Sequence, residues 1–262
     1  KKKFASHRRT NLRIMSKTVI LIPSRLSASR LPNKPLLKID NLSIIQHVYK
    51  RAQESKVGKV YVATGDEAIA EEIRKIKGKF ILTKKQHKTG TDRIFEAYKK
   101  IRKNLNCEFL INLQGDEPFI DPKDIINLNK SVISKNSDIG TLANKLSKVD
   151  IADDSIVKVI TEDNIKEKKI SRAKKFLRHC NYTPKNIFGH IGIYQFNTYV
   201  LEKFVSLKQS KNEIKYRLEQ LRAIENGINI DVVYSRNQSF GIDTVQDYVE
   251  IKKIMEYKIK KL

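Results

Sequence analysis

Short apolar runs alternate with longer amphipathic stretches along most of this chain. The apolar runs have the length of buried strands and predict strands at residues 19–22, 59–64, 80–82, 109–113, 139–143, 156–160, 191–196 and 228–233. Apolar residues at helical spacing separate several of these runs, as in the stretch with Ile44, Ile45, Val48 and Ala52. Strands that alternate with amphipathic helices predict an α/β fold with a central sheet and flanking helices.

The C-terminal half contains less regular patterns. Residues 160–188 are rich in lysine and weakly patterned, so we expect a mobile or edge segment that leads to the strand at 191–196. The alternation within 191–196 predicts an exposed sheet edge that another surface would have to cover. Two helices are also predicted, one at 245–257 and one at 213–226 with its apolar residues on one face, namely Ile214, Leu218, Leu221 and Ile224.

A cationic loop follows the first predicted strand. Residues 22–38 read IPSRLSASRLPNKPLLK and contain Arg25, Arg30 and Lys34 but no acidic residue. A curled loop would direct these three cations at one point, and guanidinium groups combined with an ammonium suit a chain of phosphates. The segment has neither a GxxxxGK[ST] loop nor a GxGxxG motif, so a triphosphate would be bound by a different device. The alternative is an ordinary solvated basic loop.

Two aspartates follow predicted strands. Asp116 comes directly after the strand at 109–113, and Asp243 lies in a Gly-Ile-Asp-Thr turn after the strand at 228–233. Open α/β sheets bind ligands at the carboxyl ends of their strands. Mg²⁺ takes one or two protein carboxylates and leaves its other positions to water and phosphates. The pair therefore predicts a Mg²⁺ site, although Asp243 alone would suit the N-cap of the helix at 245–257.

Six motifs resemble, in the same order, the successive motifs of the 3-deoxy-D-manno-octulosonate (KDO) cytidylyltransferases, also called CMP-KDO synthetases. They read IPSRLSASRLPNKPLL, HKTGTDR, INLQGDEPFI, HIGIY, LEQLRAIENG and GIDTVQDY. The resemblance implies CTP-dependent activation of KDO to CMP-KDO, with release of pyrophosphate, for lipopolysaccharide biosynthesis. A related sugar acid, 8-amino-KDO or a nonulosonic acid, is the alternative substrate.

The resemblance also implies an architecture. It predicts a Rossmann-like nucleotide-diphospho-sugar transferase fold, with a mixed, mostly parallel sheet and a small dimerisation subregion at about 160–215. One cytidylyltransferase domain would cover residues 16–256, between an extension at 1–15 and a basic tail at 257–262. The chain is expected to form a homodimer, with its contact around residues 160–196 and part of the helix at 213–226.

The motifs carry roles for individual residues. The resemblance implies that Arg25, Arg30 and Lys34 hold the triphosphate and that Asp116 and Asp243 hold Mg²⁺, and these five residues form the expected catalytic set. The expected nucleotide site also includes Pro23, Ser24, Thr89, Gly90, Arg93 and Gln114, with Thr89 and Gly90 reading the cytosine. The sugar acid would contact Gln114, Arg172, His190, Tyr194, Glu219 and Gln220.

Some of these positions have a simpler reading or depart from the family pattern. Without the resemblance, His190 would be a hydrogen-bonded core histidine and the helix at 213–226 an ordinary packing helix. Asn33 stands where the family commonly has glycine. Lys174 and Lys175 follow the Ser-Arg-Ala motif of Arg172, where the family usually has an apolar residue and then proline.

Composition raises one alternative of another class. The net charge of +24 would suit a nucleic-acid-binding protein. However, the lysines are scattered and the sequence has no aromatic-interleaved RNA motif, helix-turn-helix signature or zinc finger, so we expect no physiological nucleic-acid partner. Two cysteines, Cys107 and Cys180, predict free thiols of a cytoplasmic protein. No apolar run is long enough to span a bilayer, so no membrane association is expected.

Overall fold

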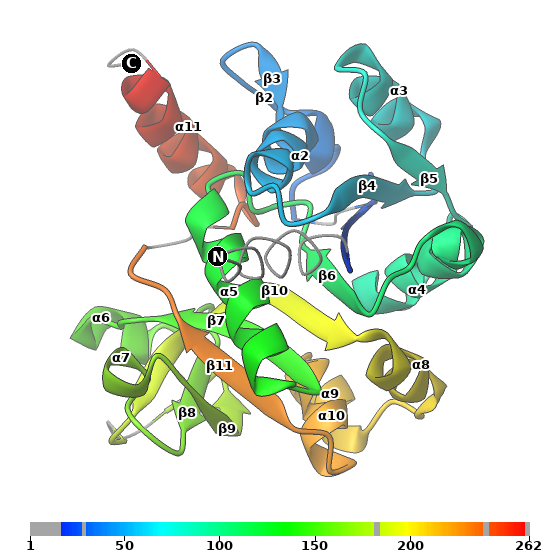
Figure 1. The fold of residues 1–262 in the computed structure, drawn as a ribbon. Helices are drawn as coiled ribbons and strands as arrows, with labels where there is room; N and C mark the ends of the chain where they lie inside the picture. Colours follow the sequence, from blue (N-terminus) through cyan, green and yellow to red (C-terminus); the bar gives the residue numbers. More distant parts are fainter. Residues whose placement is uncertain (1–16, 28–29, 181–183, 238–240, 260–262) are drawn as a thin grey trace, which may run out of the picture.

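The computed structural model describes residues 17–27, 30–180, 184–237 and 241–259 (Figure 1). The extension expected at residues 1–15 and the end of the basic tail, residues 260–262, lie outside these ranges. Within them, no helix combines the length and the apolar character that a bilayer crossing requires.

In the described part of the chain, nine strands form one sheet in the order β5-β4-β1-β6-β10-β7-β11-β9-β8. The strands are β1 Thr18–Ser24, β4 Lys59–Thr64, β5 Phe80–Leu82, β6 Phe109–Leu113, β7 Ile139–Asn144, β8 Lys158–Thr161, β9 Ile170–Leu177, β10 Ile187–Asn197 and β11 Ile230–Tyr234. Strands β5, β4, β1 and β6 pair in parallel. In the other half only β7 and β11 are parallel, and β10 runs antiparallel to β6, β7 and β8. The sheet is mixed, as expected, but mostly parallel only in its first half.

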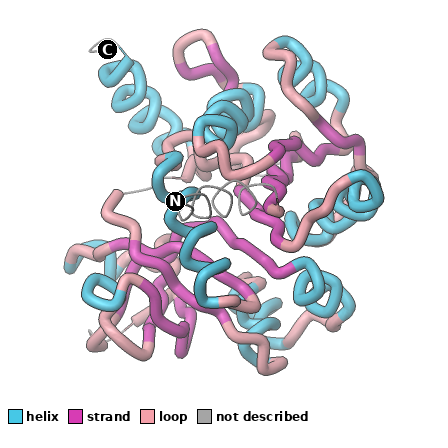
Figure 2. The backbone as a smooth tube through the Cα atoms, in the orientation of Figure 1, coloured by secondary structure: helices cyan, strands magenta, loops and turns pink. Residues whose placement is uncertain are grey.

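Helices cover both faces of the sheet (Figures 1 and 2). Along β1, Ile20 and Ile22 pack with α2, α3 and α5 on one face, whereas Val19 and Leu21 belong to the core with α4, α8 and α10 on the other. The helices are α2 Ile44–Glu54, α3 Glu67–Lys75, α4 Gly90–Ile101, α5 Pro122–Lys135, α6 Lys148–Ala152, α7 Ile165–Lys168, α8 Thr198–Ser206, α9 Lys211–Tyr216, α10 Gln220–Glu225 and α11 Val245–Ile259. Short elements are the hairpin β2 Lys38–Ile39 and β3 Leu42–Ser43 and the 3₁₀ helices η1 Lys34–Leu36 and η2 Arg102–Asn104.

The strand predicted at 191–196 is not a sheet edge. It belongs to β10, which pairs with β6 on one side and with β7 and β8 on the other. Because β8 also pairs with β9, and β9 with β11, the strands β7, β11, β9, β8 and β10 close into a ring. The prediction of an exposed edge is therefore wrong, since other strands of the same sheet pair with β10 on both sides.

The lysine-rich segment at 160–188 contains regular structure that the sequence pattern did not reveal. It holds α7, all of β9, the end of β8 and the start of β10. Strand β9 buries Ser171, Ala173 and Phe176 and exposes Arg172, Lys174 and Lys175. Only small or single apolar residues face the core, so the alternation is weak in the sequence.

The helix predicted at 213–226 is two helices. Arg217 adopts a left-handed backbone conformation with φ 54°, and this residue separates α9 from α10. As a result Leu218 is buried, whereas Ile214 is 62% exposed. The four apolar residues of this stretch therefore do not share one face. By contrast, α11 confirms the helix predicted at 245–257.

Candidate functional site

A cleft of about 360 Å³ lies where β1 and β6 end. The two strands are parallel, so their carboxyl ends meet at one edge of the sheet, the usual ligand site of open α/β sheets. The cleft is lined by Pro23, Ser24, Arg25, Ser27, Arg30, Lys34, Pro35, His87, Thr89, Gly90, Arg93, Gln114, Gly115, Asp116 and Asp243. Every residue predicted to bind the nucleotide or the metal is among them.

At the end of β1, Pro23 packs closely against two glycines, Gly115 and Gly90. A Cβ atom at Gly115 would lie 2.8 Å from the carbonyl oxygen of Pro23, which is closer than such contacts allow. A Cβ atom at Gly90 would lie 3.2 Å from Pro23 Cγ and 3.4 Å from Gln114 Oε1. Next to Pro23, the buried Oγ of Ser24 has no hydrogen-bond partner within the described residues. A buried hydroxyl without a partner is costly, so this atom is suited to a ligand contact.

Lys34 joins both aspartates of the cleft. Its Nζ donates to Asp116 Oδ2 at 2.7 Å, to the carbonyl oxygen of Ile242 at 2.6 Å and to Asp243 Oδ1 at 3.3 Å. Burial acts to lower the pKa of Lys34, but the carboxylates of Asp116 and Asp243 outweigh burial and the pKa is raised. Asn33, which precedes it, has a left-handed backbone with φ 56°, a conformation that asparagine tolerates better than most residues. The turn that directs Lys34 is thus compatible with asparagine in place of glycine.

The two arginines of the loop face the same cleft. Arg30 Nη2 lies 3.1 Å from Asp243 Oδ2, and both side chains are more than half exposed. Such an exposed pair contributes little to folding, so Arg30 can turn to a ligand at low cost. Arg25 lies close enough to Arg93 to influence it: burial is the main cause that lowers the pKa of Arg93, and the charge of Arg25 adds to it. The cleft therefore concentrates positive charge around its two carboxylates.

The donor set of the cleft fits Mg²⁺. The carboxylates of Asp116 and Asp243 contact the same ammonium, so they converge on one point. Across the described ranges, no three His, Cys, Asp or Glu side chains gather at a common metal site. Two carboxylates with open positions for phosphate and water are the arrangement that Mg²⁺ prefers.

The start of α4 forms another wall of the cleft. Thr89 is the N-cap of this helix: its Oγ1 accepts a hydrogen bond from the Asp92 amide at 3.1 Å, and its own amide donates to Asp92 Oδ2 at 3.2 Å. The hydroxyl of Thr89 is thus engaged in the cap. The contact of Thr89 and Gly90 with the base stays a prediction.

Arg93 lines the cleft but is directed toward the protein. Its guanidinium is buried and donates to Thr83 Oγ1 at 2.7 Å, to the carbonyl oxygen of Lys84 at 3.0 Å and to that of Lys85 at 2.8 Å. These bonds fasten the loop after β5 to α4. Arg93 therefore shapes the wall of the cleft, and its direct contact with nucleotide stays a prediction.

Three residues predicted to contact the sugar acid line a second cavity, of about 10 Å³. They are Tyr194, Glu219 and Gln220, and Thr91 lies beside them. Burial raises the pKa of Tyr194, and the charge of Glu219 adds to this shift. Burial likewise raises the pKa of Glu219, against the opposing effect of hydrogen bonds from Thr91 and Thr89. The volume holds about one water molecule, so the cavity itself is too small for a sugar, and the contact with the sugar acid stays a prediction.

His190, like Arg172, is absent from the lining of both cavities, but it lies next to Tyr194 and is neutral. The two rings are 5.3 Å apart, and the ring of Phe176 packs edge-on at the same distance. Thr141 Oγ1 lies 2.9 Å from His190 Nε2 and 2.7 Å from the carbonyl oxygen of Ile193. A hydroxyl has one proton, so Thr141 donates to that carbonyl and accepts from Nε2, which leaves Nδ1 as an acceptor. Burial lowers the pKa of His190 to about 3, so the group acts as a neutral hydrogen-bonding ring.

Arg172 is not brought to either cavity. It lies at an exposed position of β9, where its backbone pairs with Asp231 of β11. It is absent from the lining of both the cleft and the smaller cavity. The sugar contact predicted for Arg172 has no support from its position in this structure.

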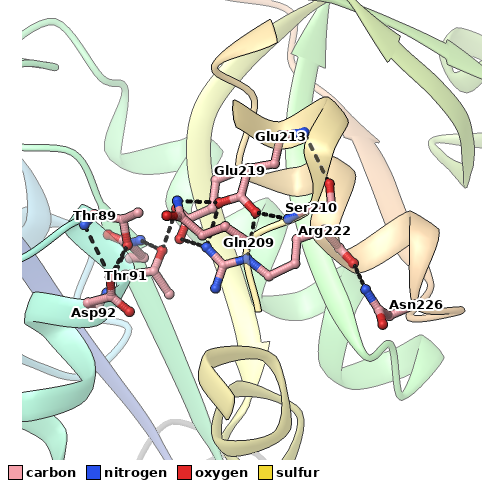
Figure 3. A network of polar contacts seen from close by, with 10 residues as sticks. Thr89, Thr91, Asp92, Gln209, Ser210, Glu213, Glu219, Arg222 and Asn226 are labelled. Carbon is pink, nitrogen blue, oxygen red and sulfur yellow. Dashed lines mark hydrogen bonds and ion pairs between the residues drawn. The ribbon is translucent and has the colours of Figure 1, made fainter. Parts of the chain in front are cut away.

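Sequence analysis did not identify four residues of this region. Asn112 and Thr91 connect the two cavities, and Arg222 and Glu213 form an ion pair next to Glu219. In Figure 3, Arg222 and Glu213 lie on one side of Glu219 and Thr91 lies on the other. Two signals were present in the sequence. Asn112 is a polar residue inside the apolar run 109–113, and Ser210 with Glu213 has the spacing of a capping box.

Comparisons with known proteins show the family of this chain. Residues 19–230 match the family model described as Cytidylyltransferase. The 3-deoxy-manno-octulosonate cytidylyltransferase of Thermodesulfovibrio yellowstonii is 40% identical over 251 residues, which cover 91% of this chain and 98% of the relative. That of Rickettsia prowazekii is 39% identical over 245 residues, with 93% and 96% covered. A solved structure of CMP:2-keto-3-deoxy-manno-octonic acid synthetase complexed with CTP is 35% identical, with a TM-score of 0.83 over 93% of this chain and 100% of that one. This chain therefore belongs to the cytidylyltransferase family, among its 3-deoxy-manno-octulosonate cytidylyltransferases.

Proposed function

We propose that this protein is a cytoplasmic enzyme that transfers CMP from CTP to KDO and releases pyrophosphate, so that it supplies an activated sugar for lipopolysaccharide. The observation that carries the proposal is one cleft in which Arg25, Arg30 and Lys34 surround Asp116 and Asp243. Transfer at phosphorus requires concentrated positive charge and a metal site, and the cleft offers both. The names of the relatives and the CTP complex of the related synthetase support the choice of substrates.

The residues of the cleft have distinct tasks in this reaction. A sugar hydroxyl attacks the α-phosphorus in line with the leaving pyrophosphate, so catalysis consists mainly of positioning and charge neutralisation. Arg25, Arg30 and Lys34 would hold the phosphates. Asp116 and Asp243 would hold Mg²⁺, which supplies further positive charge to the triphosphate when bound.

The sugar side has a different character. His190 is neutral and offers an acceptor, Tyr194 offers a hydroxyl, and Glu219 and Gln220 add further polar groups beside them. Uncharged donors and acceptors with one carboxylate suit the hydroxyl groups of a sugar. The substrate would thus bring its hydroxyls to this side and its reacting oxygen to the cationic cleft.

A substrate panel tests the function directly. We expect pyrophosphate release, measured with a coupled assay in Mg²⁺, only when CTP and a 2-keto sugar acid are both present. KDO should give the highest kcat/KM, with 8-amino-KDO and a nonulosonic acid as comparison acids and UTP as comparison nucleotide. Equal turnover with UTP, or no turnover with KDO, would contradict the assignment.

Replacement of either predicted metal ligand should abolish most turnover. Asp116→Asn and Asp243→Asn each remove one anionic ligand, and metal assistance is worth several kcal/mol, so kcat/KM should fall about 100-fold or more. Asp40→Asn is the matched control, because Asp40 is exposed and has a left-handed backbone that asparagine tolerates. Circular dichroism checks the fold of each variant. Turnover near that of the wild type in Asp116→Asn or Asp243→Asn would remove that residue from the metal site.

Substitutions in the cationic loop should weaken the binding of CTP and leave the stability of the fold nearly unchanged. Arg25→Ala, Arg30→Ala and Lys34→Ala each remove a charge-assisted phosphate contact, so KM for CTP should rise about 10-fold or more at saturating KDO. Arg51→Ala removes an exposed arginine of α2 that pairs with Glu54, and it should leave this constant unchanged. An unchanged KM for CTP in all three loop variants would show that the triphosphate lies elsewhere.

We also propose a homodimer, for which the family resemblance and an exposed apolar pair give support. Ile214 and Tyr216 on α9 are 62% and 45% exposed and lie within the stretch 213–226, part of which is expected at the contact. Multi-angle light scattering at micromolar protein should give twice the mass of one chain, and Ile214→Asp should shift it toward one chain. Val149→Asp, at a 79% exposed site on α6, is the matched control. A wild-type mass of one chain would contradict the dimer.

A further inference from the structure

The nucleotide cleft and the sugar-side cavity are joined by an unbroken series of hydrogen bonds. Gln114 Nε2 donates to Asn112 Oδ1 at 3.1 Å, and Asn112 Nδ2 donates to Thr91 Oγ1 at 3.2 Å. Thr91 Oγ1 donates to Glu219 Oε2 at 2.8 Å. The first residue of this series lines the cleft, and the last lines the smaller cavity. Asn112 and Thr91 are 1% and 2% exposed, so water does not compete for these bonds.

The direction of the series follows from the number of protons on each group. The Thr91 hydroxyl has one proton and donates it to Glu219, so its oxygen is left to accept. Asn112 must then direct its NH₂ group to Thr91 and its carbonyl oxygen to Gln114. Gln114 in turn uses its NH₂ group on Asn112, which leaves its own carbonyl oxygen at the cleft, beside Gly90. The carboxylate thus sets which end of a distant amide faces the nucleotide.

Glu219 itself is held by a buried ion pair (Figure 3). Arg222 donates through Nε to Glu213 Oε2 at 2.9 Å and through Nη2 to Glu213 Oε1 at 2.6 Å, and Nη2 also lies 3.4 Å from Glu219 Oε1. The side chains of Arg222 and Glu213 are 3% and 4% exposed. The guanidinium also stacks over the ring of Phe204 at 4.5 Å. Because Arg222 is fixed on three sides, its positive charge stays next to Glu219.

We propose that Thr91 and Asn112 are positioning residues, which transmit the orientation of Glu219 to Gln114 and so couple recognition of the sugar acid to recognition of the nucleotide. This inference rests on the proposed function, since it takes the two cavities as the two substrate sites. The carbonyl oxygen of Gln114 then accepts a hydrogen bond from a donor group of the bound substrates. The buried Thr91 hydroxyl bonds both Glu219 and Asn112, so its removal should weaken the binding of both substrates.

Thr91→Val tests the relay, because valine keeps the shape of threonine and removes both the donor and the acceptor. CTP affinity is measured by calorimetry without sugar, and KM for KDO at saturating CTP. Both should worsen about 10-fold, the cost of one buried hydrogen bond to a charged group. The matched control is Thr18→Val, which removes another buried hydroxyl, bonded to Asn129 at 2.8 Å, and should change neither value. A loss of thermal stability in Thr91→Val without any change in the two values would overturn the proposal.

A double-mutant cycle separates the relay from independent local effects. If Thr91 acts on CTP through Gln114, then Thr91→Val combined with Gln114→Leu should bind CTP within about twofold of Gln114→Leu alone. If the double variant instead loses CTP affinity by the product of the two single-variant factors, the relay is overturned. The cycle is read on CTP binding, so it also decides the case in which the wild type binds CTP but transfers no CMP to KDO. In that case the proposed function fails, while the relay stands or falls on the cycle alone.

Discussion

The contact of one ammonium with two carboxylates holds the cleft together. Lys34 belongs to η1, Asp116 follows β6, and Asp243 precedes α11, so the contacts join segments 82 and 209 residues apart. The Lys34 side chain is only 12% exposed, and a charge at such a site is costly without partners. The position of the loop therefore depends on both aspartates. A bound Mg²⁺ and triphosphate would preserve the balance, with the ion on the carboxylates and the phosphates on Lys34.

The cleft and the surroundings of Tyr194 differ in how their polar groups are stabilised. In the cleft, opposite charges compensate one another, and Lys34 keeps its proton because Asp116 and Asp243 outweigh burial. Around His190 and Tyr194, burial dominates: it makes His190 neutral and keeps Tyr194 protonated. A polyanionic nucleotide needs the first environment, whereas hydroxyl groups are recognised by fixed neutral donors and acceptors. The same sheet provides both, because β6 ends in the cleft and the neighbouring β10 carries His190 and Tyr194.

The sequence predicted best where function lies in contiguous motifs at the ends of strands. The apolar runs gave the strands of the first half, and Arg25, Arg30, Lys34, Asp116 and Asp243 do line one cleft. Prediction from the sequence failed where the local structure depended on contacts with residues remote in the sequence. Strand pairing closed a ring that includes β10 and β9, and no local alternation can reveal such pairing. A single left-handed residue, Arg217, split a helix whose apolar spacing was otherwise regular.

The buried pair of Glu213 and Arg222 shows why such partners matter more for placement than for stability. Desolvation of two charges offsets most of their attraction, so a well-packed apolar pair at these positions would give similar or greater stability. An apolar pair would, however, leave the orientation of α10 relative to α9 less defined after the break at Arg217. The planar guanidinium of Arg222 donates two parallel hydrogen bonds to the carboxylate of Glu213, and both can form only in one relative orientation of the two groups. The pair therefore fixes the start of α10, where Glu219 and Gln220 face the sugar-side cavity, at the cost of two buried charges.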